Sequence, residues 1–183
     1  MTMYIAAAIC AVGFSQVEVA AGLYTPLLRE RYHGATPASQ MVVKDAAVAM
    51  PTLRDSSSEW LKQFDEVPAD LRRAASRPSP TQSHRLDGSV FPTGTRLVSA
   101  VAVETTFRGS GIEENWSAFR RQFSAQGWLA FSDGLLADDQ LNALVYYESR
   151  CGGLCGEGGY VWLRRDSVSS PWRIAKKIVG WMA

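Results

Sequence analysis

The sequence predicts an α+β fold. A four-stranded antiparallel meander is expected in the C-terminal third, extended by one or two further strands, with helices packed on one face. Two observations lead to this prediction. The last third of the chain contains apolar, aromatic-rich runs joined by short connections, and the segments before it contain apolar residues at three- and four-residue spacing. The first pattern is typical of strands and the second of amphipathic helices.

The four strands of the meander are predicted at residues 127–132, 142–149, 160–165 and 172–181. They are enriched in β-branched and aromatic residues, which favour strands. A parallel pair of strands needs a crossover of a dozen or more residues, whereas an antiparallel pair needs only a short turn. Because the connections here are short, neighbouring strands are expected to run antiparallel.

Two further strands are predicted upstream, at residues 40–49 and 95–104, where valine-rich apolar runs occur. Asp45 lies in the middle of the first run, where a carboxylate is ordinarily solvated or located at a bulge. A position in a pocket is the alternative interpretation of Asp45.

Helices are predicted at residues 18–33, 57–64, 68–75 and 112–123. The last has the clearest single apolar face and is acidic at its start and basic at its end, as the helix dipole prefers. Its apolar face consists of Ile112, Trp116, Phe119 and Phe123.

A long connection rich in proline, serine and glycine is predicted over residues 76–94. Such composition is typical of a surface loop. The loop carries His84, for which the sequence offers no partner.

The composition is that of an ordinary globular domain. The chain has 183 residues, of which 46% are hydrophobic and 20% charged, so residues 22–183 are predicted to form a single domain with its own core. A net charge of +1 provides no bulk attraction for polyanions. No nucleic-acid partner is therefore predicted.

Residues 1–21 are predicted to be a signal peptide. The apolar run at residues 4–14 has the length of a signal-peptide core and is too short to span a bilayer as a helix. Small residues at Val19 and Ala21 allow cleavage before Gly22. The positively charged front of a signal peptide is missing, which leaves two explanations: the true start lies upstream, or this stretch is a buried N-terminal helix.

Cysteine usage agrees with export. Cleavage after residue 21 would remove Cys10 and leave the even pair Cys151 and Cys155, as an oxidising compartment favours. The predicted location is the periplasm, the cell envelope or the medium, with no membrane span once the leader is removed.

The motif Cys151-Gly-Gly-Leu-Cys155-Gly-Glu-Gly-Gly159 separates the second and third strands of the meander. Its five glycines predict an irregular loop, because glycine is used where φ is positive or backbones come close. We predict a structural disulfide between the two cysteines, worth about 2 kcal/mol in the chain-entropy model. The candidate functional residues of this loop are Gly152, Gly153, Leu154, Gly156 and Glu157.

Three other interpretations of the motif remain open. A redox-active dithiol usually has two intervening residues and precedes a helix, whereas three residues separate these cysteines. Zinc needs four ligands, and the two histidines, His33 and His84, lie far away in sequence. Glycine-rich phosphate loops lead from a strand into a helix, not into another strand. No metal and no cofactor are predicted.

The tail of the chain contains a set of motifs that belong together: Phe131-Ser132, Ala143-Leu-Val-Tyr146, Cys151-Gly-Gly-Leu-Cys-Gly156, Gly159-Tyr-Val161, Leu163, Trp172 and Trp181. In these residues the tail resembles a family of uncharacterised exported bacterial proteins. The likeness also includes the helix at residues 116–123 and, more weakly, residues 59–71, and it covers about two thirds of the chain. It implies export and a structured loop at the cysteines, and it supplies no catalytic residue.

Two functional hypotheses follow. The first is a non-catalytic binding or structural module of the cell envelope, which binds a small ligand, a glycan or a peptide on the sheet or beside the cysteine loop. The alternative is an enzyme with a pocket between sheet and helices, where Tyr32, His33, Asp45 and Glu157 would meet, or a thiol-redox protein. The usual hydrolase motifs are missing from the sequence, which favours the first hypothesis.

Overall fold

The computed structural model describes residues 22–33, 41–53, 58–77, 85–109 and 111–183. The predicted signal peptide, Cys10 and His84 lie outside these ranges.

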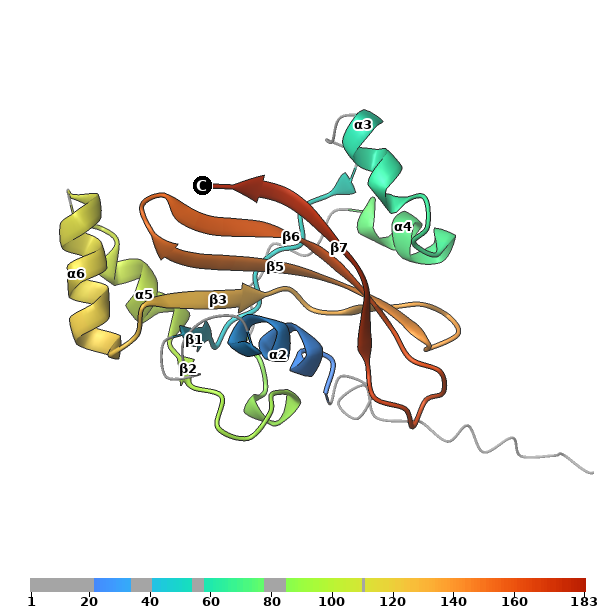
Figure 1. Ribbon diagram of the computed structural model, residues 1–183, viewed down its shortest axis with the longest axis horizontal. Helices are drawn as coiled ribbons and strands as arrows, with labels where there is room; N and C mark the ends of the chain where they lie inside the picture. Colours follow the sequence, from blue (N-terminus) through green and yellow to red (C-terminus); the bar gives the residue numbers. More distant parts are fainter. Residues whose placement is uncertain (1–21, 34–40, 54–57, 78–84, 110) are drawn as a thin grey trace, which may run out of the picture.

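The described residues form a seven-stranded mixed sheet in the spatial order β2-β1-β3-β5-β6-β7, with β4 paired separately to β5 (Figure 1). β4 continues the line of β3, because both pair with β5 on the same side. The strands are β1 (Met41–Lys44), β2 (Leu97–Val98), β3 (Gly127–Phe131), β4 (Leu135–Leu136), β5 (Asn142–Gly152), β6 (Cys155–Arg164) and β7 (Arg173–Met182).

The predicted α+β class and the antiparallel meander are confirmed. Strands β3, β5, β6 and β7 pair antiparallel in succession. The two upstream strands extend the sheet beyond β3, but each is shorter than predicted, and β1 runs parallel to both β2 and β3.

Three of the predicted helices begin and end close to the predicted positions, whereas α2 begins only at Thr25 within the predicted range 18–33, and residues 22–24 form a turn. α6 matches its prediction, although Ile112 at its start is 65% exposed instead of joining the packed face. The elements are α2 (Thr25–His33), α3 (Ser58–Leu61) with the 3₁₀ turn η3 (Lys62–Phe64), α4 (Ala69–Ala75), the 3₁₀ turn η4 (Gly88–Val90), α5 (Ala100–Thr106) and α6 (Ile112–Phe123).

Helices cover both faces of the sheet, and the expectation of a single covered face is wrong. On one face, Leu27 and Leu28 of α2 join a core cluster with Val145 and Leu163. The opposite face carries α3 and α4 at one end and α5 and α6 at the other (Figure 1). The reason is visible in β5: its successive residues from 143 to 147 are all buried, so both faces of the strand need cover.

The predicted strand at 95–104 is confirmed only at Leu97–Val98, because helix α5 begins at Ala100. Two side chains bind the first free N–H groups of this helix. Asp45 Oδ1 accepts a hydrogen bond from the Ala100 amide at 2.9 Å, and Ser99 Oγ accepts one from the Ala102 amide at 3.4 Å. These contacts satisfy donors that a helix start leaves unpaired, and they outweigh the strand preference of the valines. Only residues 97–98 remain in the sheet.

Candidate ligand-binding cleft

The turn between β5 and β6 is closed by the disulfide between Cys151 and Cys155, whose Cα atoms are 5.1 Å apart. Gly152 pairs with Cys155, and Arg150 pairs with Gly156, so Cys151 is the extra residue of a β-bulge. The resulting hairpin tip, residues 150–156, lies at the end of the sheet where α5 and α6 pack (Figure 1). The predicted structural disulfide is therefore present.

The glycine-rich motif is less irregular than predicted. β6 already begins at Cys155 and includes Gly156, Gly158 and Gly159. These glycines serve close packing within the sheet. A Cβ atom on Gly158 would collide with the Trp181 ring, and one on Gly159 would collide with the Ile178 carbonyl oxygen.

A cleft of about 380 Å³ opens between the hairpin tip and helix α6. We call it the tip cleft. Its walls combine aromatic and apolar side chains with one guanidinium, one carboxamide and the glycine backbone of the turn. The lining residues are Phe107, Ile112, Asn115, Trp116, Trp128, Arg150, Gly152 and Gly153.

The aromatic wall of the tip cleft is held by packing. The rings of Phe107 and Trp116 meet edge to face with centroids 4.8 Å apart, and Trp116 packs in the same way on Phe119 at 5.5 Å. Such pairs each contribute about 0.5–1.5 kcal/mol beyond the area they bury. Behind Trp128, the ammonium of Lys44 lies 4.6 Å from the ring centroid.

Arg150 is placed in the cleft by the register of the sheet, because it lies directly opposite Trp128 in the β3–β5 pair. Its guanidinium lies 4.4 Å from the Trp181 ring, and Trp181 Nε1 donates a hydrogen bond to Tyr146 Oη at 3.1 Å. Tyr146 in turn donates to Glu148 Oε1 at 3.2 Å. This chain of contacts gives the cation a fixed position.

The hairpin also approaches α6 closely. A Cβ atom on Gly153 would come within 2.9 Å of Ile112 Cγ2 and 3.9 Å of the Glu113 carboxylate. Gly153 therefore permits the contact between the turn and the start of the helix. Leu154, next in the turn, is 92% exposed.

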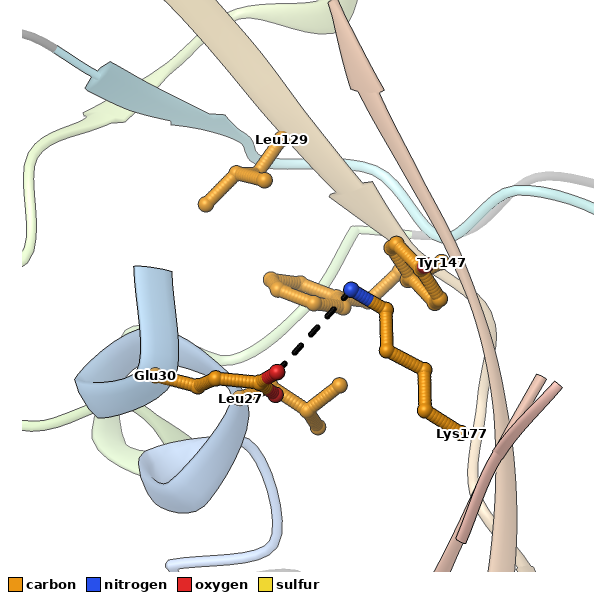
Figure 2. Close-up of a pocket in the computed structure, with 6 residues that line it drawn as sticks. Leu27, Glu30, Leu129, Tyr147 and Lys177 are labelled. Atoms are coloured by element: carbon orange, nitrogen blue, oxygen red, sulfur yellow. Dashed lines mark ion pairs between the residues drawn. The ribbon is translucent and has the colours of Figure 1, made fainter. Parts of the chain in front are cut away.

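Glu157, the last residue of the predicted functional loop, belongs to a different cluster on the face covered by α2. Its carboxylate accepts a hydrogen bond from Tyr147 Oη at 2.8 Å and pairs with Lys177 Nζ at 2.7 Å. Lys177 also reaches Glu30 of α2 at 4.0 Å, as Figure 2 shows. The adjoining gap, which Glu30, Tyr147 and Lys177 help to line, measures about 10 Å³, which is room for about one water molecule. The cluster therefore fastens α2 to the sheet and leaves no space for a substrate.

Of the three further pocket candidates, Asp45 has a structural role at the start of α5. Besides accepting from Ala100, its carboxylate lies 3.3 Å from Arg85 Nε. Its contacts thus lie with α5 and with the end of the long loop, whereas Glu157 contacts β5 and β7. Tyr32 and His33 lie in the last turn of α2, and their side chains are outside the described part of the chain.

The residues described here contain no group of three or more His, Cys, Asp or Glu side chains arranged to hold a metal ion. None of the helices in the described ranges is long and apolar enough to cross a membrane. Comparison with protein-family models, with curated proteins and with solved structures finds no match for this chain.

The sequence indicated the turn residues of the tip cleft but missed its other walls. Trp116 and Phe107 come from the helical region, and Trp128 and Arg150 come from two different strands. The signal that joins them is the pairing of Trp128 with Arg150, which requires the exact register of β3 against β5. The periodicity of a single segment carries no register information.

Proposed function

We propose that the protein is a non-catalytic binding module of the cell envelope, and that the tip cleft binds a small ligand with an apolar body and an anionic group. The observation that carries this proposal is the placement of Arg150 at the edge of an aromatic cleft beside the disulfide-closed hairpin. The cleft volume of about 380 Å³ lies within the range of small-molecule sites.

The chemistry of the walls supports this ligand class. Ile112, which is 65% exposed, and the half-buried Phe107 offer apolar surface for the body of the ligand, and the largely buried Trp116 and Trp128 reach the cleft only with small exposed areas. The guanidinium of Arg150 presents planar donors that match a carboxylate or sulfonate. Because the disulfide and the stacking on Trp181 hold these groups in place before binding, little ordering is needed when the ligand enters.

The same lining favours binding over acid–base catalysis. Arg150 is the ionisable side chain among the described residues that line the cleft. A guanidinium stays protonated at all pH values relevant to catalysis, so it binds anions but does not shuttle protons. A general acid or base would need a carboxyl, imidazole or similar group within hydrogen-bond reach of the bound molecule.

The proposal can be tested with 8-anilinonaphthalene-1-sulfonate, an aromatic probe that carries one sulfonate. We expect saturable binding by the native protein, with energy transfer from the cleft tryptophans. The variant Arg150→Gln should weaken binding about tenfold or more, because it removes a charge-assisted hydrogen bond worth about 1.5–3 kcal/mol.

The matched control is Arg121→Gln, which removes the same charge from the exposed end of α6. Near-ultraviolet circular dichroism must show native packing in each variant, since loosely packed states bind this probe without a site. Equal loss of affinity in both variants, or none in Arg150→Gln, would contradict the proposal.

Export is the second part of the proposal. It is supported by the leader-like residues 1–21 and by the disulfide, since disulfides persist in oxidising compartments. Membership in the family of exported bacterial proteins that the tail resembles is proposed on the same basis. The intact mass of protein from an export-competent host tests this: a chain that begins at Gly22 supports export, and one that begins at Met1 contradicts it.

A thiol-redox role is a second candidate, favoured by the exposure of Cys155 at the hairpin tip. Against it, the carboxylate of Glu113 lies near the turn. A negative charge there disfavours the thiolate that exchange chemistry needs. A reduction potential near that of thiol-redox enzymes would favour this candidate, and one below about −300 mV would identify a structural disulfide.

A further inference from the structure

The start of α2 lies beside the loop between β6 and β7 (Figure 1). A second cleft is lined by residues of these two segments. Its volume is about 390 Å³. We call it the arginine pocket. It is lined by Gly22, Thr25, Pro26, Arg29, Arg165, Val168, Ser169, Ser170, Pro171 and Trp172.

We propose that the arginine pocket binds a small oxyanion, the phosphate or carboxylate group of a small molecule. The central observation is Arg165, which is only 5% exposed. Its guanidinium donates to the carbonyl oxygens of Gln140 and Val168 at 2.8 and 2.7 Å and lies 4.3 Å from the Trp172 ring. These contacts orient the charge but do not neutralise it.

No carboxylate of the described residues forms an ion pair with Arg165. Burial alone lowers the pKa of its guanidinium, and no neighbouring acid offsets that effect. The nearest acid in sequence, Asp166, pairs instead with Arg173 at 2.6 Å. A buried charge without an opposite charge beside it is unfavourable, so an anion that binds next to Arg165 would offset that cost.

Two buried nitrogen atoms of the pocket residues also have no acceptor: Nη2 of Arg165 and Nε1 of Trp172. Buried donors are nearly always paired, and both of these belong to residues that line one cleft, where an acceptor on a bound ligand would pair with them. An oxyanion supplies several acceptor oxygens together with the negative charge that Arg165 lacks.

The rest of the lining suits an anion as well. Arg29 brings a second guanidinium from α2, and the lining residues include no acid. The hydroxyl groups of Ser169 and Ser170 lie on the loop, each within hydrogen-bond distance of Ser167 Oγ. The first residues of α2, a helix of nine residues, face the same cleft and add the positive end of its dipole.

The experiment is a titration of the whole protein with inorganic phosphate and, separately, with citrate, at constant ionic strength set by sodium chloride. Thermal unfolding and calorimetry report binding, because a ligand of the native state raises the unfolding temperature. We expect at least one of the two anions to raise it in a saturable way. A response to phosphate alone or to citrate alone identifies the source of the oxyanion.

The decisive variant is Arg29→Gln, because Arg29 is exposed and its loss leaves the contacts of Arg165 intact. We expect its affinity for the anion to fall about tenfold or more. Arg121→Gln, with the same charge change on α6, should bind as the native protein does. Arg165→Lys, which retains the charge but loses the planar donors, should also bind more weakly.

The proposal is overturned if neither anion stabilises the native protein more than sodium chloride does. It is also overturned if Arg29→Gln and Arg121→Gln retain the same affinity as the native protein. The second outcome would place any bound anion elsewhere on the molecule.

Discussion

Gly159 lies opposite Val179 at a bulge between β6 and β7. The two backbones come so close there that a Cβ atom on Gly159 would overlap the carbonyl oxygen of Ile178. Backbone cannot move aside without breaking the ladder, whereas a long side chain can. The residue identity at this position is therefore set by the neighbouring strand and not by the turn.

We predict that Gly159→Ala lowers the free energy of unfolding by about 2–3 kcal/mol, in the range of overpacking changes in a close-packed interior. Gly152→Ala is the matched control, because its Cβ would meet only Cys155 Cβ at an ordinary 3.4 Å. Urea unfolding of both variants checks the prediction. A destabilisation of Gly159→Ala no greater than that of the control would show that β7 can shift.

The β5–β6 hairpin has one feature that the sequence predicts, the disulfide, and one that it does not, the inclusion of the glycines in β6. The disulfide could be predicted from cysteine number and spacing, because both are local properties of the chain. That Gly158 and Gly159 belong to β6 could not, because the residues they pack against, Trp181 and Ile178, lie in the next strand. The glycines indicated close backbone approach but not its partner.

Helix α5 is a segment whose local sequence predicts a strand. Its valines favour a strand locally, yet Asp45 from the end of β1 accepts a hydrogen bond from the Ala100 amide and promotes a helix. The sequence separation of 55 residues between Asp45 and Ala100 hides this contact from any local pattern. Tertiary context thus decided the type of this element.

We predict that the double variant Cys151→Ser, Cys155→Ser folds but unfolds a few degrees lower than the native protein. The disulfide closes a short ring, for which the chain-entropy model gives about 2 kcal/mol, and each kcal/mol shifts the unfolding temperature of a chain this size by about 2–4 °C. Differential scanning calorimetry measures the shift. Complete failure to fold would mean that the hairpin depends on the bond, and an unchanged unfolding temperature would mean that the bond contributes nothing.

At the scale of the whole molecule, the sheet is buried on both faces and each face holds buried tyrosines. Tyr24 of the α2 side donates to the Ser132 carbonyl oxygen at 2.9 Å. On the opposite side, Tyr160 donates to the Pro51 carbonyl oxygen. The predicted meander has the correct order of the central strands. It does not show on which face of the sheet each helix packs. Short connections fix strand direction and leave that choice open.

The tyrosines give this architecture a dependence on alkaline pH. Burial raises the pKa of Tyr146 to about 12 and raises the pKa values of Tyr24 and Tyr160 further. In the unfolded chain these phenols ionise near pH 10. Above that pH the unfolded state holds fewer protons than the folded state, so the free energy of unfolding falls as pH rises. The stabilisation from the raised pKa values is complete below about pH 10 and is lost progressively through pH 12 and above.

We therefore predict that the urea midpoint falls steeply between about pH 10 and pH 12. The variant Tyr160→Phe lacks one of these phenols and its hydrogen bond to Pro51, so it should be less stable at pH 8. It should nevertheless lose less stability than the native protein across the alkaline range, because it has one group fewer to ionise on unfolding. Urea titrations of both proteins at several pH values measure the two slopes, and equal slopes would show that Tyr160 ionises as readily in the fold as outside it.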